Sequence, residues 1–245
     1  MSGAEQSLPR DAAIVVLTGA GISAESGLAT FRGPDGLWEG HRVEDVCTPE
    51  ALAHDRGLLL DFYDARRRAL AAVEPNAAHR ALAQLDATWP GELLIVTQNV
   101  DDLHEHAGAR RLVHIHGELL SALCEACGAR SPFAGDMAPA PACPECDRSG
   151  RLRPDIVFFG EMPYEMPAIE RAIARADLFV SIGTSGAVYP AAGFVRLAQA
   201  AGARTLELNL ERSAGSDLFD EIRIGPAGQL VPAWVEELVG SGGEA

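Results

Sequence analysis

The chain has 245 residues, 47% of them hydrophobic and 22% charged, which suits one large α/β domain or one domain with a small insert. Its 35 acidic and 20 basic residues give a formal net charge of −15. This charge argues against nucleic acid and anionic membranes as partners, because clustered basic side chains hold phosphates, and it suits a basic, lysine-bearing protein better.

Apolar runs and helical periods alternate along most of the chain. Strands are predicted where short apolar runs end in turn residues, at 12–17, 93–97, 112–115, 178–182, 205–210 and 221–224. Helices are predicted where apolar residues share one face, at 57–72, 75–85, 187–201 and 230–239. This alternation predicts an α/β fold with a parallel sheet covered on both faces. No apolar run approaches the roughly 18 residues of a membrane span, and 12–17 is too short for a signal peptide, so we expect a cytoplasmic protein.

The segment 123–153 breaks this rhythm, because it is rich in Pro, Gly, Ala and Cys and has no helical period. It holds four of the five cysteines, as Cys124-x-x-Cys127 and Cys143-x-x-Cys146, with fifteen residues between the pairs. In a reducing compartment such pairs favour metal over disulfides or a redox pair. Four thiolates make a closed tetrahedral zinc site, so the sequence predicts one structural, non-catalytic zinc ion that orders this segment. Cys47 is expected to be a small buried hydrophobic residue.

A glycine-rich turn, Gly19-Ala20-Gly21-Ile22-Ser23, follows the first predicted strand. Its glycines allow backbone N–H groups to approach a phosphate closely. The next glycine comes only at Gly27, so the spacing is not G-x-G-x-x-G, and a plain strand-to-helix turn explains the pattern nearly as well. Farther along, Phe31, Arg32 and Trp38 suggest a loop that sets an aromatic ring and a cation over a nucleotide.

Polar residues also follow the strand at 93–97, in the run Thr97-Gln98-Asn99-Val100-Asp101. Ligands bind at the carboxyl ends of strands in open α/β sheets, and amide and carboxylate groups there can hold a carboxamide such as that of nicotinamide. From the spacing alone, a polar turn that caps the next segment is slightly favoured.

Two histidines, His114 and His116, stand at the end of the next predicted strand, where alternation puts them on the same face. A neutral imidazole suits a general base, but either residue could instead be structural, and the spacing does not choose between them. His104 and His106 have no cysteine or carboxylate at ligand spacing beside them, so we expect surface or helix residues there.

Taken together, these pieces resemble the sirtuin family of NAD-dependent deacylases, and most closely its bacterial and mitochondrial branch that removes acidic acyl groups. The matches follow the family's order over nearly the whole chain, from about 12 to 239. They are Gly19–Ser23, Phe31-Arg32, Thr97–Asp101, His116-Gly117, the four paired cysteines, Phe159-Gly160-Glu161, Gly183-Thr184-Ser185 and Asn209-Leu210-Glu211.

The resemblance implies a Rossmann-like parallel sheet with helices on both faces, plus a small zinc-ribbon and helical domain, in one catalytic unit over 10–245. The large domain would comprise about 10–45, 75–120 and 155–240, and the small domain about 46–74 and 121–154. NAD and acyl-lysine would meet in the cleft between them.

The resemblance also implies roles for individual residues. The catalytic set would be His116, Asn99 and Asp101. The NAD set would be Gly19, Ala20, Gly21, Ile22, Ser23, Phe31, Arg32, Trp38, Gln98, Asn99, Val100, Asp101, Gly183, Thr184, Ser185, Asn209, Leu210, Glu211 and Ala227. The substrate set would be Tyr63, Arg66, Val157, Phe158, Phe159 and Val188, and zinc would lie on Cys124, Cys127, Cys143 and Cys146. In the implied reaction the acyl-lysine displaces nicotinamide, His116 takes a proton from the ribose hydroxyls, and O-acyl-ADP-ribose leaves with free lysine.

Tyr63 and Arg66 lie three positions apart on the predicted helix 57–72 and therefore share a face. A guanidinium binds a carboxylate through two hydrogen bonds, and a phenol adds a third, which suits succinyl- or malonyl-lysine. From the residues alone, a solvated arginine and a half-buried tyrosine are the simpler reading. The related branch carries the same Tyr-x-x-Arg, which reverses that preference.

Three alternatives stay open beside an acidic-acyl deacylase. They are a deacylase that prefers acetyl-lysine, a mono-ADP-ribosyltransferase, and a non-catalytic NAD sensor that uses its zinc ribbon for partner contact. A general base at His116 argues against mere binding, and Arg66 distinguishes the two deacylases. The sequence does not decide the oligomeric state, and a monomer is compatible with it.

Overall fold

A six-stranded parallel sheet forms the larger part of the molecule in a computed structural model that describes residues 8–29, 40–138 and 140–240. The strand order is β3-β2-β1-β7-β8-β9. The strands are β1 (Ile14–Thr18), β2 (Leu93–Thr97), β3 (Leu112–His114), β7 (Leu178–Ile182), β8 (Arg204–Asn209) and β9 (Glu221–Ile224). Every residue of β1 and β7 is buried, because helices cover both faces of the sheet and central parallel strands are then apolar throughout.

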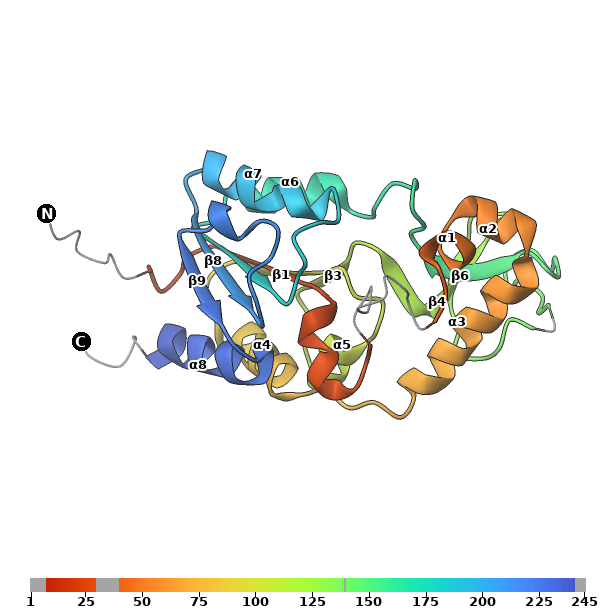
Figure 1. Ribbon diagram of the computed structural model, residues 1–245, viewed down its shortest axis with the longest axis horizontal. Helices are drawn as coiled ribbons and strands as arrows, with labels where there is room; N and C mark the ends of the chain where they lie inside the picture. The colour runs from red at the N-terminus through yellow and green to blue at the C-terminus, as the bar shows by residue number, and fades with distance from the viewer. Residues whose placement is uncertain (1–7, 30–39, 139, 241–245) are drawn as a thin grey trace, which may run out of the picture.

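Helices α4 (Ala77–Thr88) and α8 (Ala227–Gly240) cover one face of this sheet, and α6 (Met166–Ile173) and α7 (Phe194–Ala200) cover the other (Figure 1). The short α5 (Leu103–Ala107) packs beside α4. Separate apolar clusters fill the two faces. Within the described ranges, no helix combines the length and apolar character that a bilayer span requires.

The smaller part gathers at the opposite end of the molecule from β8 and β9 (Figure 1). It contains α1 (Val43–Val46), α2 (Pro49–His54), α3 (Arg56–Leu70), β4 (Gly117–Cys124), β5 (Arg130–Pro132) and β6 (Leu152–Ile156). The three strands form an antiparallel sheet in the order β5-β4-β6. Its own apolar cluster packs α3 against β4 and β6, through residues such as Leu59, Ala122 and Ile156.

The α/β fold class predicted from the sequence is confirmed, and β2, β7 and β9 have the predicted bounds. The helix predicted at 187–201 is shorter, because a 3₁₀ turn (Ala191–Gly193) follows Pro190 and α7 begins only at Phe194. The segment 123–153, which has no helical period, contains β5 and the beginning of β6, and both of these strands pair with β4. These two strands have no apolar run in the sequence, since their residues are Arg130-Ser131-Pro132 and Leu152-Arg153-Pro154-Asp155-Ile156.

Candidate active site

The strand order reverses direction between β1 and β7, because the chain runs outward to β2 and β3 before it returns to β7. In an open α/β sheet such a switch point leaves a crevice at the carboxyl ends of the strands. Here the turn after β1 meets the turn after β7: Gly19 N donates to Ile182 O (3.0 Å) and Gly21 N donates to Gly183 O (2.9 Å). A Cβ on Gly19 would lie 2.8 Å from Gly183 O. These glycines are therefore needed for the two turns to touch.

A cavity of about 1210 Å³ opens at this switch point and extends to helix α3. Most residues that the sequence singled out lie around it. They are Gly19, Ala20, Gly21, Ser23, Arg66, Gln98, Asn99, Val100, Asp101, His116, Val157, Phe158, Phe159, Gly183, Thr184, Ser185, Val188, Asn209, Leu210, Glu211 and Ala227. Ile22 lies beneath the glycine turn in the core. Phe31, Arg32 and Trp38 lie outside the described residues.

A buried hydrogen-bond network joins the glycine turn to the turn after β2. Asn99 Nδ2 donates to Ser23 Oγ (3.0 Å), which donates to Asp101 Oδ2 (3.1 Å). The N–H of Asn76 donates to His79 Nδ1 (3.3 Å), so His79 Nε2 carries the proton and faces Ser23 Oγ at 3.4 Å. Sequence reasoning missed His79. Its signal was a helix-capping pattern, an Asn with a polar residue three positions later.

His116 and His114 differ in how their ring nitrogens are used. His116 Nδ1 donates to Gln98 O (3.1 Å), which leaves the lone pair on Nε2. Burial lowers the pKa of His116 below its usual value, although the Gln98 carbonyl acts against this. His114 bonds to Asn99 O (2.9 Å) and to Glu105 Oε1 (2.8 Å). Burial alone would lower the pKa of His114, but its partners, Glu105 above all, raise it. His114 therefore has no ring nitrogen left to accept a proton.

His79 and His104 form a second histidine pair, which is buried and does not line the cavity. His104 was expected at the surface or on a helix; it lies on α5, but a surface position is wrong, because its ring is fully buried. It packs edge-on against His79, with ring centroids 5.0 Å apart, and its Nε2 lies 3.0 Å from Thr18 Oγ1. Burial lowers the pKa of His79 from 6.5 to about 4, and that of His104 well below its usual value.

This pair should make the protein sensitive to mild acid. Because the folded-state pKa of His79 is about 4 and the unfolded value is about 6.5, the unfolded chain binds the proton more tightly. The free energy of unfolding is therefore unaffected by the protonation of His79 above about pH 6.5. It falls as the pH drops toward 4, and the loss is about 2 kcal/mol at pH 5. The measurement is the urea midpoint at pH 7 and pH 5. His79→Gln should flatten this pH dependence, and an unchanged slope in that variant would contradict the assignment.

At the α3 end of the cavity, Arg66 and Tyr63 lie at different depths. Arg66 lines the cavity, with its guanidinium carbon 5.5 Å from the centroid of the Phe62 ring. Tyr63 is fully buried behind the cavity wall, where it packs against Phe62 and Phe158. Burial raises the pKa of Cys47, although a hydrogen bond with Tyr63 acts against this. Cys47 is buried, as expected, but it also lines the cavity, which the sequence did not indicate.

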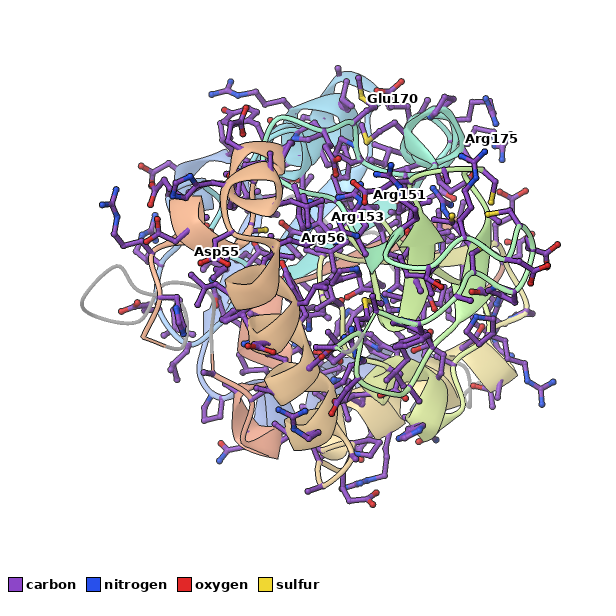
Figure 2. The ribbon with its side chains drawn as sticks, turned by 90° about the vertical axis from the view of Figure 1, so that its right-hand side faces the viewer. Asp55, Arg56, Arg151, Arg153, Glu170 and Arg175 are labelled. Carbon is purple, nitrogen blue, oxygen red and sulfur yellow. The ribbon has the colours of Figure 1, made fainter. Side chains whose placement is uncertain are left out.

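The segment that follows β6 forms another wall of the cavity. Val157 N donates to His116 O (2.9 Å) and Phe159 N donates to Cys47 O (3.0 Å), so this wall is tied to both ends of the site. The carboxylate of Glu161 accepts from Phe158 N (2.9 Å) and pairs with Arg153 (2.8 Å). Arg56, in the first turn of α3, donates to the carbonyl of Leu152, which precedes Arg153 in β6 (Figure 2).

The four paired cysteines are positioned to bind one metal ion. Their Sγ atoms all lie within 4.8 Å of one another, and the Cys124–Cys146 and Cys127–Cys143 separations are both 3.8 Å. Corners of a tetrahedron with metal–sulfur bonds of about 2.3 Å lie about 3.8 Å apart, as zinc requires. Both pairs form the same turn, since Gly128 N donates to Cys124 O and Asp147 N to Cys143 O, each with positive φ. The donor set and its geometry fit a closed structural zinc site.

Known proteins are similar to this chain over most of its length. A model of the Sir2 family matches residues 19–190. The NAD-dependent protein deacylase of Caulobacter vibrioides is 55% identical over 229 residues, which cover 92% of this chain and 96% of that protein. A crystal structure of a Sir2 homologue–NAD complex superposes with a TM-score of 0.86 at 35% identity, covering 95% of this chain and 91% of the other. Sir2 bound to an acetylated peptide gives 0.78 at 26% identity, covering 93% of each. The chain belongs to the Sir2 family.

Proposed function

We infer that this chain is an NAD-dependent protein deacylase that acts on acyl-lysine and prefers acidic acyl groups. One observation carries the inference: a single cavity holds the paired glycine turns, the Asn99–Asp101 network and a histidine with a fixed, neutral base nitrogen. Relatives of more than half identity bear the name NAD-dependent protein deacylase. A non-catalytic sensor would not need that histidine.

The donor set around the cavity fits NAD, which would supply the reactive bond between its ribose and nicotinamide. The Gly19–Ser23 turn, with Thr184 and Ser185, would hold the phosphates through backbone N–H and hydroxyl groups. Asn209 and Glu211, which follow β8, would bind the adenosine ribose, and Ala227 would lie by the adenine. The remaining cofactor contacts would come from Phe31, Arg32, Trp38, Gln98, Val100, Gly183 and Leu210.

Asn99 and Asp101 would hold the nicotinamide carboxamide at the other end. Their side chains are fixed by Ser23, so little conformational freedom would be lost when the ligand binds. Burial raises the pKa of Asp101, although its hydrogen bonds with Leu103 and Ser23 act against this. His116 would remove a proton from a ribose hydroxyl through Nε2, while its Nδ1–H stays bound to Gln98 O.

Acyl-lysine would enter between Val157–Phe159 and Val188, pairing with these backbones as an added strand. Arg66 would bind the carboxylate of a succinyl or malonyl group. The Phe62 ring beneath the guanidinium limits the freedom of this side chain and attracts its positive charge. Tyr63 would contribute from behind the pocket wall, where it packs against Phe62 and Phe158.

Arg66→Met is expected to lower kcat/KM for a succinyl-lysine peptide by about 30-fold, or about 2 kcal/mol, because a charge-assisted hydrogen-bond pair is lost. Activity on the matched acetyl-lysine peptide should be retained. The measurement is product mass in mixtures with NAD. Arg68→Met is the matched control, since Arg68 is exposed on the same helix.

Two outcomes would contradict this proposal. Equal losses on both peptides in Arg66→Met would remove Arg66 as the acyl selector. NAD cleavage without loss of either acyl group would favour a mono-ADP-ribosyltransferase instead.

The same proposal covers the substrates, the compartment and the domain organisation of the enzyme. Its substrates would be acyl-lysine-bearing proteins, whose basic surfaces suit a net charge of −15. Four cysteines without disulfides at one metal site suit a reducing compartment, which supports the cytoplasm. The two sheets support a division into a large and a small domain, with α1 and the whole of β4 in the small one, and the reaction would take place in the cleft between them.

A further inference from the structure

An ion pair is buried on the side of α3 that packs against the cysteine-bearing segment. Asp64 and Arg67, three positions apart, are paired there with side chains only 3% and 1% exposed. Such a pair is costly to bury unless every remaining donor and acceptor is satisfied. The partners of these two side chains therefore show what the pair holds together.

Those partners are backbone groups outside the helix. The Asp64 carboxylate accepts from Met137 N (2.9 Å) and Ala138 N (3.3 Å). The Arg67 guanidinium donates from Nε to Gly135 O (3.0 Å) and from Nη1 to Leu119 O (3.4 Å). We call Asp64, Arg67 and these four backbone partners the clamp. It joins α3 to the loop between β5 and Cys143 and to β4.

Arg66 lies between the two clamp residues in sequence but points to the cavity. At about 100° per residue, it occupies a different face of the helix from Asp64 and Arg67. A rotation of α3 by about 10° would move a group about 6 Å from its axis by about 1 Å. Displacements of this size are enough to spoil a binding geometry.

We propose that Asp64 and Arg67 are positioning residues, which fix the rotation of α3 and thereby aim Arg66 at the acyl carboxylate. This inference rests on the proposed role of Arg66. The planar guanidinium of Arg67, held by three acceptors in different directions, and the two N–H groups on Asp64 resist both rotation and sliding of the helix.

A second set of hydrogen bonds attaches α3 to the cysteine-bearing segment. Arg56, in the first turn of α3, donates to Glu125 Oε2 (2.7 Å) and to Leu152 O (2.7 Å). Glu125 lies between Cys124 and Cys127, and Figure 2 shows Arg56 at the junction of α3 with β6. The helix is thus attached to the cysteine-bearing segment at its first turn and again at the clamp.

The test compares full-length Asp64→Asn with wild type in two measurements. The first is hydrogen–deuterium exchange, which should be faster in 56–70 and 133–138 and unchanged in 178–209. The second is kinetics on matched peptides. The KM for succinyl-lysine should rise about 10-fold, while kcat and the KM for acetyl-lysine stay within about twofold.

Arg68→Gln provides the matched control. Arg68 pairs with Asp136 (2.6 Å) and so joins the same helix to the same loop, but both side chains are about half exposed. Such a pair contributes little, and neither measurement should change. Arg67→Lys is the conservative variant: it keeps the charge but cannot reach all three acceptors, and a smaller KM shift is expected. It also serves if Asp64→Asn does not fold.

Unchanged exchange in both segments would overturn the proposal. Parallel losses on acetyl- and succinyl-lysine would overturn it too, because they would indicate a general structural role. A wild-type enzyme that processes both peptides equally well would overturn the acyl preference instead, and the exchange result alone would then decide whether the clamp holds α3.

Discussion

His116→Asn is expected to lower kcat by about 10²- to 10⁴-fold, the usual contribution of a general base. The asparagine amide can still donate to Gln98 O, as His116 Nδ1 does at 3.1 Å. It has no lone pair in place of Nε2, so the proton of the ribose hydroxyl has no acceptor. The measurement is steady-state kinetics with NAD and an acyl-lysine peptide, together with NAD binding, which should change little.

His114→Asn is the control for this variant. His114 has both ring nitrogens committed to Asn99 and Glu105 and lies outside the cavity lining. Its replacement should lower the free energy of unfolding and leave kcat within about threefold of wild type. Full activity of His116→Asn, or an equal loss of kcat in both variants, would remove His116 as the base.

The elements predicted best are those whose burial produces a recognisable apolar pattern in the local sequence. Strands β2 and β7 are continuous apolar runs that end in turn residues, because both faces of the sheet are covered. The glycine turn after β1 was also visible. Its partner at Gly183 could be paired with it only through the resemblance, since Gly19 and Gly183 are 164 positions apart and the contact depends on strand order.

The parts that the sequence could not show depend on partners far along the chain. The choice between His114 and His116 depends on Glu105 and on two carbonyls after β2. The depth of Tyr63 depends on how α3 packs against the wall that Phe158 belongs to. A hydrophobic or helical period predicts which face of an element is buried but not what it meets there.

Cys143→Ser is expected to abolish zinc binding and nearly all activity, although no cysteine of the quartet lines the cavity. A structural zinc site contributes an apparent free energy on the order of 10 kcal/mol to folding. Without the zinc ion, nothing would hold the two cysteine turns together. The loop carrying Gly135, Met137 and Ala138 would then lose its order, and with it the buried partners of Asp64 and Arg67.

We therefore expect Cys143→Ser to retain less than about one tenth of a zinc ion per chain and to melt at least about 10 °C below wild type. The measurements are metal analysis by mass spectrometry and calorimetry, with wild type in EDTA expected to approach the variant. Cys47→Ser is the control, because Cys47 is buried outside the quartet and its replacement should leave one zinc ion per chain. Wild-type activity in a zinc-free Cys143→Ser protein would show that the cysteine-bearing segment does not support α3, because the loop that holds Asp64 and Arg67 would then be dispensable.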